Sequence, residues 1–586
     1  MVNISNSLSL LLLSATLLVN QASEAAYVWP RPQEFHQGDT TIMVSSGLDF
    51  QIHGKGKYIG VAKKAAERYR QVIRKEKWAP YVRWSETPVD SSGEEMARKN
   101  MIPVKKGNTW LKKVLLQIED GNANLELNTD ESYSLDIPGG NGTKKAITAT
   151  IKSKTVFGAL RGLETLSQLV NYQKEIGRYI SYGPWNIQDK PSYKHRGFML
   201  DVTRNFFSVE EIKTQIDALS WNKFNVLHLH LTDAQSFSLA SEVYPQLHEM
   251  AYAKFQSGMI YTKRDIQDLV GYALERGIRI VPEIEMPGHA YATGTPFPGM
   301  LVCANVQPVW RAIEYQPPSG QFDVTQDITY EVTENLIKEV SSWFPDEFLH
   351  TGGDEVGMRC YKESEVFQKN LKEKNLTVIE AMQHFYNKVD DYVSATGKRP
   401  IVWEEALLNK ELNLTIPKHF IVQQWTGSQN TKLIVGQGHD IIQSGSDYWY
   451  LDVGHGRHAP GWVDCPTCDK YRTWQKIYSN DLRANLTEAE GIHVLGGEIA
   501  LWTEQVDSFN LETQMWPRAS AAAEVLWSGY SAINYTDMFG SVKRAFPRLN
   551  EWRYRMGGRG VKGASIAPLW CVKEMGWCDL PAGFEA

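Results

Sequence analysis

The chain has 586 residues and a mass of 66.5 kDa, enough for a barrel with long loops and one smaller domain. Its 42% hydrophobic and 22% charged residues are typical of a globular protein. The formal net charge of -6 argues against a basic protein that binds nucleic acid.

The first predicted element is an apolar run from Leu8 to Val19, followed by small residues. Although no Lys or Arg precedes it, this run is typical of a secretory signal peptide cleaved after Ala22 or Ala25, so we assign residues 1–25 to a leader. The alternative is a membrane anchor, but the run is shorter than the ~20 residues that span a bilayer. We therefore expect no membrane span.

Five Asn-x-Ser/Thr sequons follow the leader. They lie at Asn141, Asn375, Asn413, Asn485 and Asn534. Together with the leader they predict passage through the secretory pathway, to an extracellular, lysosomal or vacuolar destination.

The six cysteines allow 15 pairings. Two pairs are close in sequence, and a third would bridge distant loops; these are Cys465 with Cys468, Cys571 with Cys578, and Cys303 with Cys360. A zinc site built from His455, His458, Cys465 and Cys468 is an alternative. An oxidising compartment favours a disulfide between Cys465 and Cys468, so we expect no metal and no cofactor.

From residue 26 to 188 the chain mixes alternating apolar and polar runs with two helical runs, at 58–75 and 157–172. Alternation with period two predicts strands, and the two amphipathic runs predict helices. We expect a separate α/β domain with one sheet and two covering helices. It contains no recognisable catalytic cluster.

From residue 189 to 560 short apolar runs alternate with longer segments. Eight such runs begin near residues 196, 225, 278, 348, 399, 419, 440 and 493. Eight parallel strands with intervening helices predict a (β/α)8 TIM barrel, preceded by the smaller α/β sheet domain. Residues 561–586 are left as a tail with a disulfide loop.

Polar and aromatic residues follow these runs at the ends where the active site of a barrel lies. They are Arg204, Asp233, His289, Asp354, Glu355, Trp403, Glu404, Trp425, Trp449, Tyr450, Asp452, Trp502 and Glu504. Tryptophan faces and carboxylates at one mouth suit a sugar. His228 and His230 lie on one face of the second strand, and we interpret them as packing residues.

Asp354 and Glu355 are adjacent in "FLHTGGDEVG". Neighbours on a strand point to opposite faces, so this pair is poorly placed to flank a glycosidic bond from about 5 Å apart, as most retaining enzymes require. A 2-acetamido sugar brings its own nucleophile, the amide carbonyl oxygen. Asp354 would then hold the acetamide, and its charge would raise the proton affinity of Glu355, the general acid and base.

The motifs "HRGFMLDVTRNFF", "NKFNVLHLHLTDAQSF", "PEIEMPGHA", "HTGGDEV", "DYWYLD" and "GGEIALWTE" resemble, in order, those of glycoside hydrolase family 20, the β-N-acetylhexosaminidases of the eukaryotic secreted or lysosomal type. The N-terminal region also resembles the small α/β domain of that family. The resemblance implies an exo-enzyme that removes terminal β-linked GlcNAc or GalNAc from oligosaccharides or glycoconjugates, with retention. A homodimer is common in such families, but no segment here establishes one.

The resemblance also implies roles for single residues. Asp354 would orient the acetamide, Glu355 would be the acid and base, Tyr450 would donate to the acetamide carbonyl, and Asp233 and His289 would form a hydrogen-bonded chain to Glu355. Trp403, Trp425 and Trp502 would enclose the N-acetyl group and the ring, Arg204 would bind the 3- and 4-hydroxyls, Glu504 the 4-hydroxyl and Asp452 the 6-hydroxyl. Relatives that accept 6-sulfated sugars have Asn-Arg where this chain has Asp452-Val453, so we expect neutral substrates.

Two alternatives stay open. A non-catalytic carbohydrate-binding relative would keep the pocket without turnover. A retaining glycosidase with two carboxylates, such as Glu355 with Glu404 or Glu504, would accept sugars that lack the acetamido group.

Overall fold

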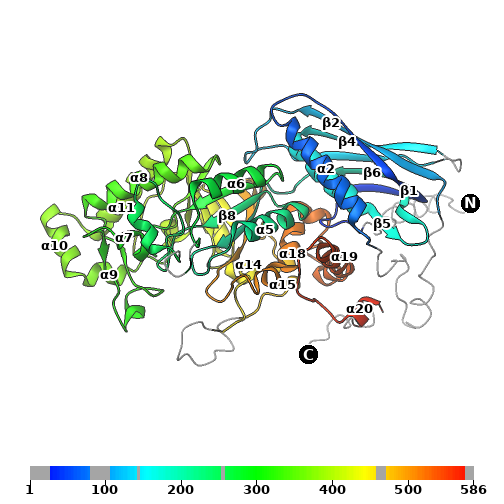
Figure 1. Ribbon diagram of the computed structural model, residues 1–586. Helices are drawn as coiled ribbons and strands as arrows, with labels where there is room; N and C mark the ends of the chain where they lie inside the picture. Colours follow the sequence, from blue (N-terminus) through cyan, green and yellow to red (C-terminus); the bar gives the residue numbers. More distant parts are fainter. Residues whose placement is uncertain are drawn as a thin grey trace, which may run out of the picture.

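The computed structural model describes residues 27–78, 106–140, 145–252, 256, 258–456, 470–573 and 578. It contains a mixed sheet followed by a closed eight-stranded barrel, which confirms the predicted fold (Figure 1). Within those residues, no helix combines the length and the apolar character needed to cross a bilayer.

The N-terminal part is a sheet with the order β1-β2-β4-β3-β6-β5, in which β1 also pairs with β6. Its strands are β1 (Glu34–His53), β2 (Thr109–Asp120), β3 (Tyr133–Ile137), β4 (Lys145–Thr155), β5 (Val170–Gln173) and β6 (Gly177–Asp189). Side chains along β2 and β4 alternate between buried and exposed, as period-two sequences do when one face is covered. Two packed helices, α2 (Ile59–Lys75) and α4 (Val156–Leu169), cover that face, as the sequence predicts (Figure 1).

The barrel closes in the order β7-β8-β9-β12-β13-β14-β15-β16, with every neighbouring pair parallel. The strands are β7 (His195–Asp201), β8 (Val226–His230), β9 (Arg279–Glu283), β12 (Phe348–His350), β13 (Arg399–Trp403), β14 (Ile421–Gln424), β15 (Asp440–Gln443) and β16 (Val494–Leu501). All eight apolar runs predicted as strands are therefore confirmed. Figure 1 shows the helices arranged around them.

Several helices outside the barrel begin where capping residues satisfy their first amide groups. Ser208 and Glu211 form a capping box at α5, Thr262 and Asp265 do so at α6, and Thr377 and Glu380 at α11. The helices are α5 (Val209–Trp221), α6 (Lys263–Leu274), α7 (Tyr291–Gly294), α8 (Asp327–Trp343), α9 (Met358–Glu363), α10 (Glu365–Lys374), α11 (Val378–Ala395), α12 (Glu405–Leu408), α13 (Asn430–Gly436), α14 (Ser446–Trp449), α15 (Trp474–Tyr478), α16 (Glu488–Gly491), α17 (Leu511–Met515), α18 (Arg518–Trp527), α19 (Met538–Gly558) and α20 (Leu569–Lys573). A short ribbon, β10 (Leu301–Val302) with β11 (Gln321–Phe322), closes the third loop.

The amino-terminal end of the barrel is filled by apolar side chains. They are Val226, Val281, Phe348, Ile401, Ile421, Ile442 and Leu495, and the sheet domain adds Leu127 to the same cluster. Leu127 reaches this cluster from the connection between β2 and β3, and its amide group donates to Glu347 at 2.5 Å. The sheet domain thus contributes one residue to the core of the barrel.

Buried ion pairs hold the two parts together. Arg196 of β7 pairs with Glu131 of the sheet domain at 2.7 Å, and Arg161 of α4 donates to the carbonyl oxygens of Phe224 and Gly277, which belong to the barrel. Lys223 pairs with Asp189 at 2.8 Å, and both side chains are fully buried. Breaking either pair would leave a charge in an apolar interface, so the domains are expected to stay fixed to each other.

Two of the predicted disulfides form, Cys303 to Cys360 and Cys571 to Cys578. The first joins the third and fourth barrel loops. Cys465, Cys468 and His458, and the sequon at Asn141, lie outside the described residues. The other four sequon asparagines, Asn375, Asn413, Asn485 and Asn534, are exposed.

Candidate active site

An open pocket of about 340 Å³ lies at the carboxyl ends of the barrel strands. Most of the predicted site residues line it: Arg204, His289, Asp354, Glu355, Trp425, Tyr450, Asp452, Trp502 and Glu504. Trp403 and Asp233 lie behind the lining, both about 1% exposed. Of the two places that the sequence leaves open for Trp449, the pocket wall or the core, the structure shows the core: Trp449 is fully buried and donates to the carbonyl oxygen of Ile477.

The turn that carries the carboxylate pair begins after β12 ends at His350. Gly352 and Gly353 have φ values of 65° and 100°, which favour glycine, and Glu355 has a φ of 48°. Asp354 and Glu355 therefore lie in a loop and do not alternate across a strand. The sequence argument that they point to opposite faces is wrong, because the strand stops four residues before Asp354.

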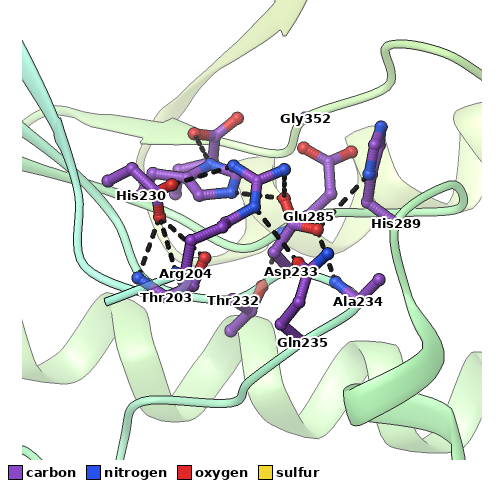
Figure 2. A network of polar contacts seen from close by, with 12 residues as sticks. Thr203, Arg204, His230, Thr232, Asp233, Ala234, Gln235, Glu285, His289 and Gly352 are labelled. Carbon is purple, nitrogen blue, oxygen red and sulfur yellow. Dashed lines mark hydrogen bonds and ion pairs between the residues drawn. The ribbon is translucent and has the colours of Figure 1, made fainter. Parts of the chain in front are cut away.

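His289 brings the two carboxylates together. Its Nε2 atom lies 3.2 Å from Oε2 of Glu355 and 3.9 Å from Oδ2 of Asp354, and its Nδ1 atom lies 3.3 Å from Oδ1 of Asp233. Figure 2 shows His289 beside Asp233, within a network of polar contacts. The predicted chain from Asp233 through His289 to Glu355 is thus present as a set of contacts.

Arg204 anchors the other side of this network. Its guanidinium pairs with Asp233 at 2.7 Å (Figure 2). It also pairs with Asp201 at 2.9 Å and lies 5.0 Å from the ring centre of Trp502. Gln316 accepts a hydrogen bond from Arg204 at 2.9 Å and donates one to Glu504 at 3.0 Å. Arg204, Gln316 and Glu504 therefore form one hydrogen-bonded end of the pocket.

The walls beside the carboxylates are aromatic. Trp425 and Tyr450 are stacked with ring centres 6.2 Å apart, and Trp502 packs against Tyr450 at 6.4 Å. Trp403 lies 6.1 Å from Trp502 and donates its indole N–H to Glu283 at 2.7 Å, which fixes the ring. Apolar faces beside fixed polar groups are typical of a site that binds a sugar ring.

Burial and neighbouring charges set the protonation of the site. Burial raises the pKa of Asp354 to about 6, against the attraction of His289, and the charge of Glu355 adds to the rise. Burial opposes the charge on His289, but Asp233 and the other carboxylates outweigh it and hold the pKa of His289 well above its usual range. His289 is thus an imidazolium between carboxylates.

The histidines of the second strand are buried and pack against aromatic rings, as predicted, and they are also ion-paired. His228 contacts Glu498 at 2.7 Å and Glu283 at 3.1 Å, and His230 contacts Asp233 at 2.9 Å. The carboxylates outweigh burial and raise the pKa of His228 to about 9 and that of His230 to about 10. Because Glu283 and Glu498 come from other strands, strand periodicity alone gives no sign of these pairs.

Sequence reasoning missed Gln316 and Glu405. Gln316 belongs to the long third loop, where no periodic pattern predicts its position, and Glu405 accepts the indole N–H of Trp425 at 2.8 Å. Glu404, named in the two-carboxylate alternative, turns away from the pocket: it accepts from Thr426 and Asn430 and is 1% exposed.

The carboxylates and imidazoles also form groups whose ligand atoms could surround a cation. One group is His289, Asp354 and Glu355, with those atoms within 4.8 Å of one another. A histidine binds a metal ion as neutral imidazole, however, and the surrounding carboxylates raise the pKa of His289 well above its usual range and favour the imidazolium form. The donor set therefore fits proton transfer better than metal binding.

Comparisons with known proteins agree over nearly the whole chain. Residues 193–530 match the model described as "Glycosyl hydrolase family 20, catalytic domain", and residues 28–169 match "beta-acetyl hexosaminidase like". A probable beta-hexosaminidase of Arthroderma benhamiae is 36% identical over 564 residues, covering 88% of this chain and 87% of that protein. A chitooligosaccharidolytic beta-N-acetylglucosaminidase of Bombyx mori is 30% identical over 568 residues, covering 94% and 89%. The structure of a Flavobacterium johnsoniae chitobiase matches with a TM-score of 0.70 at 26% identity, covering 92% of this chain and 73% of that one.

Proposed function

Because the chain belongs to glycoside hydrolase family 20 and is a β-hexosaminidase, we propose that it removes terminal β-linked GlcNAc or GalNAc by retaining, substrate-assisted hydrolysis. The observation that carries this proposal is the convergence of Asp354 and Glu355 on one imidazole, that of His289. Two carboxylates that act as acid and nucleophile must flank the bond across a sugar, whereas here a histidine lies next to both.

In the first step Glu355 gives its proton to the leaving oxygen as the bond from that oxygen to the anomeric carbon breaks. The acetamide carbonyl oxygen forms a new bond to the anomeric carbon from the opposite face. Asp354 accepts the acetamide N–H and stabilises the positive charge that develops, and Tyr450 donates to the carbonyl oxygen. In the second step Glu355 takes a proton from the water that attacks the anomeric carbon, the bond from that carbon to the acetamide oxygen breaks, and the product keeps the β configuration.

The environment of each carboxylate suits these roles. The side chain of Asp354 is 13% exposed and lies 3.9 Å from Nε2 of His289, whose positive charge favours the carboxylate form of Asp354. Glu355 has a side chain that is 25% exposed, so water and the leaving group can reach it. Asp233, pinned by Arg204 and His230, orients His289 toward Glu355.

The hydrogen-bonded end of the pocket supports action on terminal sugars. Arg204, Gln316 and Glu504 are joined by hydrogen bonds there, and the first and last are proposed to bind the 3- and 4-hydroxyls. A substituent on either hydroxyl would break its hydrogen bonds to Arg204 or Glu504 and offer no new ones, so the affinity would fall. We propose that substrates end at this sugar, and that the chain acts in the secretory pathway, as its leader, sequons and disulfides suggest.

Two measurements test the proposal together. Nuclear magnetic resonance of the first product from an aryl N-acetyl-β-glucosaminide should detect the β anomer before mutarotation. A thiazoline analogue of GlcNAc, which mimics the cyclised intermediate, should inhibit competitively, and an aryl β-glucoside without the acetamide should not be cleaved. An α product, or cleavage of the glucoside without thiazoline inhibition, would overturn the proposal in favour of a two-carboxylate glycosidase.

A further inference from the structure

A buried carboxyl group supports the turn that carries Asp354. Glu285, two residues after the end of β9, is 1% exposed. Its Oε1 atom accepts the amide N–H of Gly353 at 2.8 Å and that of Met286 at 3.1 Å, while its own amide N–H donates to Thr232 at 2.8 Å. Figure 2 shows Glu285 pointing toward Gly352, beside His289.

The two glycines of the turn fit closely against their neighbours. A Cβ atom added at Gly352 would lie 2.0 Å from Oε1 of Glu285, and one added at Gly353 would lie 2.8 Å from the hydroxyl oxygen of Tyr386. Both glycines have positive φ, which an L residue adopts at a cost of about 1 kcal/mol or more. Glu285 and Tyr386 therefore confine the turn from two sides just before Asp354.

We propose that Glu285 is a positioning residue that fixes the Gly352-Gly353 turn and thereby aims Asp354 at the acetamide group. The inference rests on the role proposed above for Asp354. Glu285 lines no part of the pocket, so it acts through the backbone of the turn.

The protonation of Glu285 agrees with this role. Burial raises its pKa well above the usual range, and the nearby carboxylates Asp354 and Glu283 raise it further. These influences favour the neutral form of Glu285, which adds no negative charge behind Asp354. A glutamine at this position would keep a neutral group with an acceptor oxygen for the Gly353 amide.

The test compares Glu285→Gln with Glu285→Met, which keeps the length of the side chain and removes the acceptor. On an aryl N-acetyl-β-glucosaminide, Glu285→Met should lower kcat/KM about 100-fold, which is the loss expected when a catalytic group is misplaced by about 1 Å. Most of this loss should be in kcat. Glu285→Gln should keep most of the activity. Equal activity of the two variants would overturn the proposal.

Double variants separate positioning from a general loss of structure. If Glu285 acts through Asp354, adding Glu285→Met to Asp354→Asn should change kcat/KM by no more than about twofold. A full 100-fold further loss would overturn the positioning role and leave the proposed function standing. If Asp354→Asn alone kept the wild-type rate, the proposed function itself would fail.

A matched control is Glu339, which is also buried and also accepts two backbone amides, those of Glu242 and Val243. It lies on α8 and lines no part of the pocket. Glu339→Met should lower the melting temperature and leave kcat of the folded protein unchanged. A kcat loss in Glu339→Met as large as that in Glu285→Met would overturn the specific role of Glu285.

Discussion

His289 and Glu355 face each other across 3.2 Å from the loops after β9 and β12, and both residues have left-handed backbones with φ of 46° and 48°. Non-glycine residues in this region cost about 1 kcal/mol or more each and are found where the surrounding structure enforces them. Here the fixed turn beside Glu285 and the bridge from Cys303 to Cys360 hold the two loops. The surrounding loops therefore enforce the contact between His289 and Glu355.

The first prediction concerns the general acid. Glu355→Gln keeps the size of the side chain but cannot give a proton to the leaving oxygen. We expect a loss of about 10²- to 10⁴-fold in kcat/KM on chitobiose, whose leaving sugar needs protonation, and a much smaller loss on a dinitrophenyl glycoside, whose leaving group does not. Steady-state kinetics on both substrates checks this difference.

A matched control for that variant is Glu404→Gln, because Glu404 is adjacent to the pocket wall but turns away from the pocket. Glu404→Gln should change kcat/KM by the same factor on chitobiose and on the dinitrophenyl glycoside. Equal losses on chitobiose and on the dinitrophenyl glycoside in Glu355→Gln would contradict the role of Glu355 as the acid.

The second prediction is that kcat/KM has an acidic limb, that is, that it falls as the pH is lowered below about 6. The proposed role needs Asp354 as a carboxylate, and its pKa is raised to about 6, mainly by burial. Protons therefore accumulate on Asp354 as the pH falls through 6, so kcat/KM should fall about tenfold per pH unit below that value. The residual activity of Asp354→Asn should lack this limb. A profile that stays flat from pH 7 down to pH 4.5 would contradict the assignment.

The third prediction concerns sulfated sugars. Asp452 lines the pocket next to Val453, and in its proposed place beside the 6-hydroxyl its carboxylate would repel a 6-sulfate. The double variant Asp452→Asn, Val453→Arg should raise the ratio of kcat/KM for a 6-sulfated aryl substrate over its unsulfated form by at least about tenfold. The conservative variant Val453→Leu should leave the ratio unchanged. An unchanged ratio in the double variant would show that other residues exclude the sulfate.

The fourth prediction tests the contact between the domains. Leu127 is 7% exposed within the apolar end of the barrel, so Leu127→Ala should lower the free energy of unfolding by about 3 kcal/mol. Leu433 is 58% exposed, and Leu433→Ala should change the same quantity by less than about 0.5 kcal/mol. Urea unfolding followed by tryptophan fluorescence measures both. Equal effects would contradict the role of Leu127 in the barrel core.

The sequence predicted the strands and most of the pocket because both follow short-range patterns. Apolar runs such as Val226–His230 mark barrel strands, and polar residues at their ends, such as Asp233, must meet at one mouth in a parallel barrel. The family motifs then assigned roles to these residues.

What the sequence did not predict depends on contacts between distant segments. Gln316 and Glu285 gain their importance from partners on other loops. The pairs of His228 with Glu283 and Glu498, and of His230 with Glu283, join residues of different barrel strands. Asp354 and Glu355 were misplaced on a strand because the sequence does not reveal that β12 is only three residues long.

The most direct test of the account is kcat/KM of Asp354→Asn on an aryl N-acetyl-β-glucosaminide, in a preparation whose thermal unfolding shows that it is folded. Because the asparagine cannot provide the charge that orients the acetamide and stabilises the cyclic intermediate, we predict a loss of at least about 100-fold. The melting temperature at pH 7 should not fall, since a carboxylate with a raised pKa costs stability above that pKa. A folded Asp354→Asn protein with wild-type kcat/KM would contradict the central claim.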